Sequence, residues 1–220
     1  MFAYAVRERM IARNPVHGVR MPSSTRIAKS TETFTTEELD LTINQQRRLC
    51  PHLASVTEFL SLTGLRWSEL RALRVRDLQR HPLPAIRVSR AHSESYAEKG
   101  TKSGRARLVP LTQRANELAA SRTLGREPDD YLFTSVTSRQ LRSSRFRSIV
   151  AWSTTAPPGR SIHDLRHYAA SEWLRAGIPV NQVAKWLGHA SPSTTLNAYA
   201  HVLGEAQDIA ALEHLNALHR

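Results

Sequence analysis

The segment from Ser161 to Val202 constrains the structure and chemistry of this chain more than any other. It reads SIHDLRHYAASEWLRAGIPVNQVAKWLGHASPSTTLNAYAHV. Ser161 followed three residues later by Asp164 has the pattern of a capping box, and Gly177 is a typical helix stop, so a helix is predicted from Ser161 to Gly177. Residues at i, i+3 and i+4 of a helix share one side. This helix therefore presents a polar stripe of His163, Arg166 and His167.

The other side of the same predicted helix is apolar, with Leu165, Ala169 and Trp173. An apolar side of this kind packs against a core. The cationic side is then left for an anion.

A second helix is predicted after Pro179, because proline suits a first turn and an apolar stripe at helical spacing follows it as far as Gly188. That stripe consists of Val180, Val183, Ala184 and Leu187. The helix end brings His189 to a fixed position, and Tyr199 follows near the end of the segment. Together these side chains have the composition of a reaction centre.

The chain carries 31 Lys and Arg against 19 Asp and Glu, a formal net charge of +12, and its isoelectric point is near 10.9. Such an excess of positive charge favours a polyanionic partner, with nucleic acid first. A merely solubilising basic surface is the alternative. Much of the excess lies in segments that also carry the motifs, which favours nucleic acid.

A chain of 220 residues, 40% of them hydrophobic, suffices for one substantial domain with appendages. No stretch reaches the ~20 apolar residues of a transmembrane helix, and no charged segment followed by an apolar run opens the chain. We therefore expect no membrane partner and a cytoplasmic, nucleoid-associated location. The single Cys50 cannot form an internal disulfide and is interpreted as a core or boundary residue.

Outside this segment the patterns predict mostly helices, at 2–12, 35–46, 54–62 and 112–121. Asn14-Pro15 ends the first of these, and residues 19–33 have the composition of a linker. Residues 85–91 and 107–111 are predicted strands that flank a glycine-containing turn, which indicates a hairpin. Apolar residues after position 203 recur at the spacing of a final amphipathic helix. The expected fold is mainly α with a small antiparallel β-sheet (α+β).

Four motifs together resemble the tyrosine recombinases, the phage integrase family of lambda-integrase and Xer type. They are TGLRWSEL at 63–70, TKSGRARLVPL at 101–111, HDLRH at 163–167, and LGH at 187–189 followed by a tyrosine. In the hairpin motif, Lys102 lies eight residues before Pro110, as the family's lysine does, and Lys99 is its alternative. The resemblance implies the catalytic residues Arg66, Lys102, His163, Arg166, His189 and Tyr199.

The resemblance further implies an enzyme that cuts and rejoins DNA strands. Tyr199 would attack the phosphodiester and form a 3′-phosphotyrosine, with His163 as its proton acceptor. Lys102 would protonate the departing 5′-oxygen. The two arginines and His189 would meet the negative charge of the transition state. Because fixed cations surround the phosphate, neither a cofactor nor a metal ion is expected.

Some of these residues have other interpretations. His163 and His167 have the i, i+4 spacing of a zinc pair, but no glutamate lies between them in an HExxH pattern, and Arg166 would repel a cation. His167 is therefore interpreted as a structural residue of its helix. Arg66 has the alternative of a simple helix-start pair with Glu69. Tyr168 is the next candidate nucleophile.

A run of arginines precedes the central segment, and phosphate contact is favoured for it over a merely solvated face. Its members are Arg139, Arg142, Arg145 and Arg147. The partners that the resemblance implies are double-stranded DNA attachment sites, a tetramer of the full-length protein on DNA, and accessory DNA-bending or directionality proteins.

In family terms, residues 1–21 match the C-terminal remnant of a core-binding domain, 22–32 a linker, 33–202 the catalytic domain and 203–220 a C-terminal amphipathic helix. The expected function is that of a site-specific recombinase (integrase), in a truncated form. The alternatives are a DNA-binding remnant without full recombination activity and a nicking-closing enzyme like topoisomerase IB.

Overall fold

The computed structural model describes residues 2–15, 33–91, 99–100 and 106–218. The chain divides into two compact units, residues 1–32 and 33–220. The first contains α1 (Phe2–Arg7). This helix is shorter than the predicted 2–12, because Arg9 adopts a positive φ of 55° that a right-handed helix does not allow. The predicted linker at 22–32 lies outside the described residues.

The second unit begins with two helices that the sequence predicts well. Thr35 caps α2 (Thr36–Leu49) in a complete capping box with Glu38. The helix α3 (Pro51–Thr63) starts on a proline and ends at Gly64, whose φ of 59° is left-handed. Most of α3 is buried, and it packs against α2, α5 and α8 at the centre of the main hydrophobic core.

A three-stranded antiparallel sheet has the order β1 (Leu78–Gln79), β2 (Ala85–Val88) and β5 (Arg107–Pro110). A short 3-10 helix, η1 (Val75–Asp77), precedes it. After β2, the strands β3 (Arg90–Ala91) and β4 (Lys99–Gly100) pair in a separate two-stranded antiparallel sheet. The predicted hairpin is therefore confirmed, although the strand expected at 85–91 is divided in two. Lys102 lies outside the described residues.

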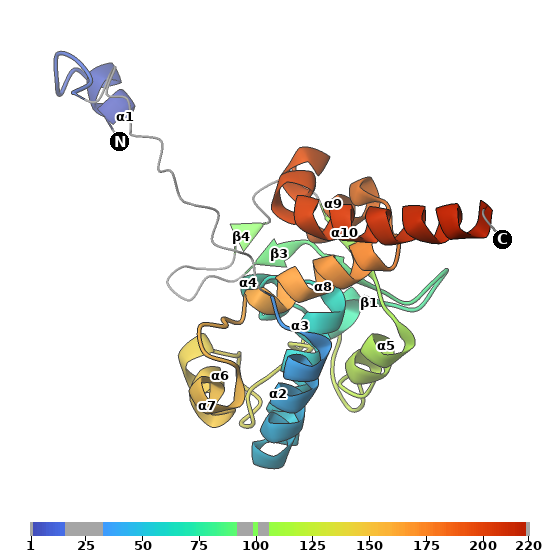
Figure 1. The fold of residues 1–220 in the computed structure, drawn as a ribbon. Helices are drawn as coiled ribbons and strands as arrows, with labels where there is room; N and C mark the ends of the chain where they lie inside the picture. The colour runs from blue at the N-terminus through green and yellow to red at the C-terminus, as the bar shows by residue number, and fades with distance from the viewer. Residues whose placement is uncertain (1, 16–32, 92–98, 101–105, 219–220) are drawn as a thin grey trace. The chain divides into compact units, whose positions relative to one another are not determined.

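The remaining helices are α4 (Trp67–Leu70), α5 (Gln113–Ala120), α6 (Ser143–Ile149), α7 (Trp152–Thr155), α8 (Asp164–Arg175), α9 (Val180–Leu187) and α10 (Pro192–Leu218). The expected fold class, mainly α with a small antiparallel sheet, is confirmed. In Figure 1, α9 and α10 lie above α8, and α2, α5, α6 and α7 lie below it. A second apolar cluster joins α8, α9 and α10 and includes Leu174, Leu187 and Tyr199.

Two further predicted helices have different limits in the structure. The helix expected to begin at Ser161 begins at Asp164, because the hydroxyl of Ser161 donates to the Asp164 carboxylate (2.9 Å) instead of accepting from a helix N–H. At the other end of the chain, the amphipathic helix expected from 203 is continuous with α10. Among the described residues of α10, the backbone departs from helical geometry only at Tyr199 (φ −126°, ψ 19°).

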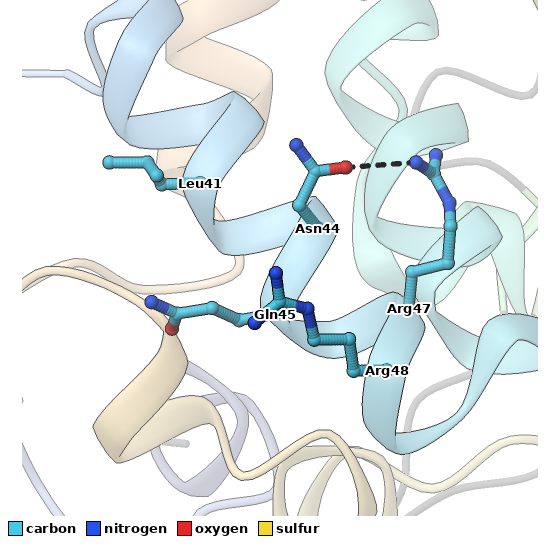
Figure 2. A pocket seen from close by; sticks show the side chains of 5 residues that line it. All are labelled: Leu41, Asn44, Gln45, Arg47 and Arg48. Carbon is cyan, nitrogen blue, oxygen red and sulfur yellow. Dashed lines mark hydrogen bonds between the residues drawn. The ribbon is translucent and has the colours of Figure 1, made fainter.

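Within the described ranges, no helix combines the length and apolar character needed to cross a membrane. A hollow lies on the exposed face of α2 (Figure 2). Its lining residues are Leu41, Asn44, Gln45, Arg47 and Arg48. Figure 2 shows Asn44 accepting a hydrogen bond from Arg47 (3.0 Å). This hollow shares no residue with the sites that the sequence predicts.

Candidate active site

Arg66 follows the sharp turn that separates α3 from α4. The turn needs a glycine at Gly64, both for its positive φ and because a Cβ there would lie 3.0 Å from the Trp173 ring. The backbone N–H and the guanidinium of Arg66 both donate to the Glu69 carboxylate, at 2.9 and 2.8 Å. The pairing given as the alternative role of Arg66 is therefore present. Its side chain is still 40% exposed and open to a ligand.

Glu69 is buried, and two arginines surround it. Arg107 donates to both of its carboxylate oxygens, at 2.9 and 2.8 Å, and Arg66 binds the same carboxylate. Burial alone would raise the pKa of Glu69, but hydrogen bonds and charge attraction from Arg107, and then from Arg66, outweigh burial and hold this pKa below its ordinary value. The carboxylate is therefore ionised at neutral pH.

Arg166 is buried at the start of α8, only 3% exposed. Its guanidinium donates to the carbonyls of Gly64 (2.8 Å) and Leu187 (2.6 Å) and to Nε2 of His189 (3.2 Å). Burial, and next the charge of Arg66, lower its pKa to about 9. The group remains charged at pH 7, yet these partners are all neutral. A buried cation in such a setting favours an incoming anion.

His189 is fixed by the end of α9. Gly188 has a left-handed φ of 69°, and the N–H groups of Gly188 and His189 return to the carbonyls of Lys185 (3.1 Å) and Ala184 (3.0 Å). These bonds form a Schellman motif. The last two carbonyls of α9 accept hydrogen bonds from arginines. The carbonyl of Trp186 accepts from Arg107 (2.7 Å), and that of Leu187 accepts from Arg166.

The tautomer of His189 follows from its two contacts. An arginine can only donate, so Nε2 accepts from Arg166, and Nδ1 carries the proton that it donates to the hydroxyl of Thr195 at 2.7 Å. Burial, and then the charges of Arg166 and Arg66, lower the pKa of His189 to about 4. The ring is therefore neutral at pH 7.

Tyr199 is 2% exposed, in the apolar cluster of α8, α9 and α10. Its hydroxyl lies 2.8 Å from Nδ1 of His167. Burial raises the pKa of Tyr199 to about 12, although Arg166 opposes the rise. Burial also lowers the pKa of His167. At neutral pH the contact therefore joins a phenol and an uncharged imidazole.

The contacts of His163 and His167 differ from those that their predicted roles require. His163, the expected proton acceptor, is exposed, and its ring centroid lies 5.0 Å from that of His167. His167, interpreted as structural, is the histidine that contacts Tyr199. The difference arises because His163 precedes α8, whereas His167 lies a full turn inside it and faces α10.

The remaining candidates have other contacts or exposed positions, and Lys102 lies outside the described residues. The hydroxyl of Tyr168 is 3.3 Å from Thr36 of α2, not among the site arginines. Lys99 pairs through its backbone with Ala91. The arginines at 139, 142, 145 and 147 are all exposed, around and within α6. In the part of the chain that the structure describes, no group of three His, Cys, Asp or Glu side chains is arranged to hold a metal ion.

Sequence reasoning missed three side chains of this site. The sequence predicts Arg107 only as the start of a strand and Glu69 only as a partner of Arg66, and it gives no role to Thr195. Glu69 lies inside the family motif at 63–70 and Arg107 inside the one at 101–111. The available signal was the alternation of the strand, which puts Arg107 on the same face as the apolar Val109.

Several solved structures share this fold. The integrase of transposon Tn1549 in complex with transposon right end DNA superimposes with a TM-score of 0.73, at 19% identity, over 98% of this chain and 75% of that chain. The XerA recombinase gives 0.62 at 23% identity over 83% of this chain and 65% of that chain. The catalytic domain of bacteriophage HP1 integrase gives 0.58 at 21% identity over 81% and 92%. The fold is that of tyrosine recombinase catalytic domains.

Curated relatives agree with the fold. A tyrosine recombinase of Pseudothermotoga lettingae is 31% identical over 87% of this chain and 63% of its own length. A XerC-like tyrosine recombinase of Caldanaerobacter subterraneus subsp. tengcongensis is 28% identical over 99% of this chain and 63% of its own length. The chain thus spans less than two thirds of both relatives. A sequence model of the phage integrase family matches residues 32–205, and the chain belongs to that family.

Proposed function

We propose that this chain carries the catalytic centre of a site-specific DNA recombinase that cuts and rejoins strands through a 3′-phosphotyrosine on Tyr199. The observation that carries the proposal is the convergence of Arg66, Arg166 and His189 from three separate segments. Arg166 contacts both the Gly64 turn next to Arg66 and the ring of His189. These cationic and polar groups form a cradle suited to a phosphodiester.

The phosphate would be held by the guanidinium groups of Arg66 and Arg166, which are planar and can each donate to two oxygens. His189 is an acceptor at Nε2 in the free chain. The negative charge of a bound phosphate favours a proton on Nε2, and the ring would then become a third donor. Its bond to Thr195 holds the ring plane during this change.

In the proposed cleavage step, the Tyr199 oxygen attacks phosphorus, a Tyr–O–P bond forms and the bond to the 5′-oxygen breaks. The sequence predicts His163 as the proton acceptor, but we propose His167 for this role, since its Nδ1 lies 2.8 Å from the phenol oxygen. The departing 5′-oxygen takes a proton from Lys102. Rejoining reverses the step, so no external energy source is needed.

The proposed partners are double-stranded DNA attachment sites, contacted in part by the exposed arginines at 139, 142, 145 and 147. The integrase of Tn1549 and the XerH recombinase were both solved with bound DNA, which supports a DNA partner for this chain. A tetramer on DNA, with accessory bending or directionality proteins, remains part of the proposal. So does the division into a core-binding remnant, linker, catalytic domain and C-terminal helix.

The experiment is the trapping of a covalent complex on a nicked suicide DNA substrate, with candidate attachment sequences. The Tyr199→Phe protein should form no complex. Tyr168→Phe is the matched control, because Tyr168 is the neighbouring buried tyrosine on α8 and contacts α2 instead of the cradle. The complex should also form in the presence of EDTA. A complex that survives in Tyr199→Phe, or is lost in Tyr168→Phe alone, contradicts the assignment.

A further inference from the structure

Arg107, the first residue of β5, contacts two parts of the site that lie far apart in the sequence. Its Nη1 and Nη2 donate to the two carboxylate oxygens of Glu69, at 2.9 and 2.8 Å. Its Nε donates to the carbonyl of Trp186, at 2.7 Å. The side chain is 11% exposed. Each of the three guanidinium nitrogens therefore donates to a group of the protein itself.

The Trp186 carbonyl is one of the last carbonyls of α9, which have no partner inside the helix. The Schellman turn uses those of Ala184 and Lys185. The carbonyl of Trp186 depends on Arg107 for its partner. A cation at this helix end is also favoured by the helix dipole. Arg107 thus stabilises the turn that leads directly into His189.

The Glu69 carboxylate accepts hydrogen bonds from the backbone and the guanidinium of Arg66 and from two nitrogens of Arg107. These donors match the capacity of a carboxylate, which has about four lone-pair directions. Without Arg107, half of this set is lost around a buried charge, and Glu69 would move to find other donors. Arg66 is held by the same carboxylate and would move with it.

The guanidinium of Arg107 is also packed closely against the end of α9. A Cβ at Gly188 would lie 2.9 Å from Nη1 of Arg107, so the guanidinium passes directly against the turn before His189. This contact leaves little freedom for either group. The bridge runs from α4 through β5 to the end of α9.

We propose that Arg107 is a positioning residue, which keeps Arg66 and His189 at a fixed separation by fastening Glu69 to the Trp186 carbonyl. This inference rests on the proposed function in one respect, which is that Arg66 and His189 are taken to bind a phosphodiester. A lysine at this position would keep the charge but, as a single point donor, would not reach both ends of the bridge with the same geometry.

The first test uses the unchanged protein. The ¹⁵Nε–H resonance of Arg107 should be visible and exchange with water at least about 10-fold more slowly than that of Arg114. Arg114 is the matched reference, because its Nε donates to Glu58 at 2.6 Å in an exposed ion pair. Equal exchange rates would mean that the bridge to the Trp186 carbonyl does not exist, and would overturn the proposal without any variant that has to fold.

The second test compares Arg107→Lys with Arg114→Lys. In the free chain, the ring ¹⁵N resonances of His189 should change in Arg107→Lys and stay the same in Arg114→Lys. On the suicide substrate, Arg107→Lys should form the covalent complex about 100-fold more slowly, as expected from a small misplacement of reacting groups, with little change in DNA affinity. Arg114→Lys should match the parent.

The two readouts separate the inference from the proposed function. If the parent chain forms no covalent complex on any duplex, the proposed function fails, and the role of Arg107 is decided by the His189 resonances alone. If Arg107→Lys leaves both the His189 resonances and the cleavage rate as they are in Arg114→Lys, Arg107 is not a positioning residue.

Discussion

The phenol oxygen of Tyr199 lies 2.8 Å from Nδ1 of His167, and this contact joins α10 to the helix that carries Arg166. Tyr199 is buried, and its backbone departs from helical geometry at that residue. Its ring lies in the apolar cluster that α8, α9 and α10 form. The contact fixes the direction of the phenol and places an imidazole nitrogen beside its oxygen.

Replacing His167 with alanine tests that contact. The phenol would lose its neighbouring acceptor, so the rate of covalent complex formation at pH 7 should fall about 100-fold or more, in the range typical of a lost general base. His163→Ala is the matched control, since His163 is the exposed histidine at the start of the same helix. A larger loss in His163→Ala than in His167→Ala would restore His163 as the principal acceptor.

Anion binding to the cradle is the second prediction. Sulfate should raise the melting temperature of the parent protein more than chloride does at equal ionic strength, because a bound dianion neutralises the buried Arg166. Sulfate also stabilises proteins in general, so the comparison is with Arg166→Met, whose response should be reduced to the general part. Arg114→Met controls for the loss of an arginine elsewhere. Equal sulfate responses in all three proteins would contradict an anion site at Arg166.

The third prediction concerns stability at low pH. The pKa of His189 is lowered to about 4 from its ordinary 6.5, by burial first and then by Arg166. In the window between these values the unfolded chain takes up the proton more readily, so this histidine's contribution to stability is present above about pH 6.5 and is lost as the pH falls toward 4.

Urea unfolding at several pH values measures this contribution. His189→Gln removes the ionisation, so its unfolding free energy should fall less steeply than the parent's as the pH is lowered through this window. His163 and His167 also have lowered pKa values, so the difference between the two proteins, rather than the parent's slope, is the relevant quantity. Parallel slopes would show that His189 is not held neutral by the fold.

DNA binding by these 220 residues should be governed by phosphate contacts and show little sequence preference. We expect the affinity for unrelated duplexes to be similar and to fall steeply with added salt. Arg145→Ala, on the exposed side of α6, should weaken binding to all duplexes and lower the salt slope by about 1. Arg114→Ala should change neither. Strong preference for one duplex at physiological salt would contradict this prediction.

Local signals in the sequence determined much of this structure. The capping box of Thr35, the left-handed glycines Gly64 and Gly188, and the alternating strands around the hairpin each depend on residues within a few positions of one another. For this reason the fold class and most helices were predicted. The start of α8 was missed because the hydroxyl of Ser161 had two possible partners, and only the folded turn selects between them.

The grouping of the site was decided by tertiary structure. His167 and Tyr199 are 32 positions apart, and Arg107 and Trp186 are 79 apart. At such separations the sequence shows that a donor and an acceptor exist, but not that they meet. Packing of α8, α9, α10 and β5 selects these pairs, because a buried polar group must find a partner within reach, and the closest partner depends on the whole fold. The sequence determined which residue types the site contains. The roles of His167 and Arg107 were decided by the buried contacts that only the folded chain makes.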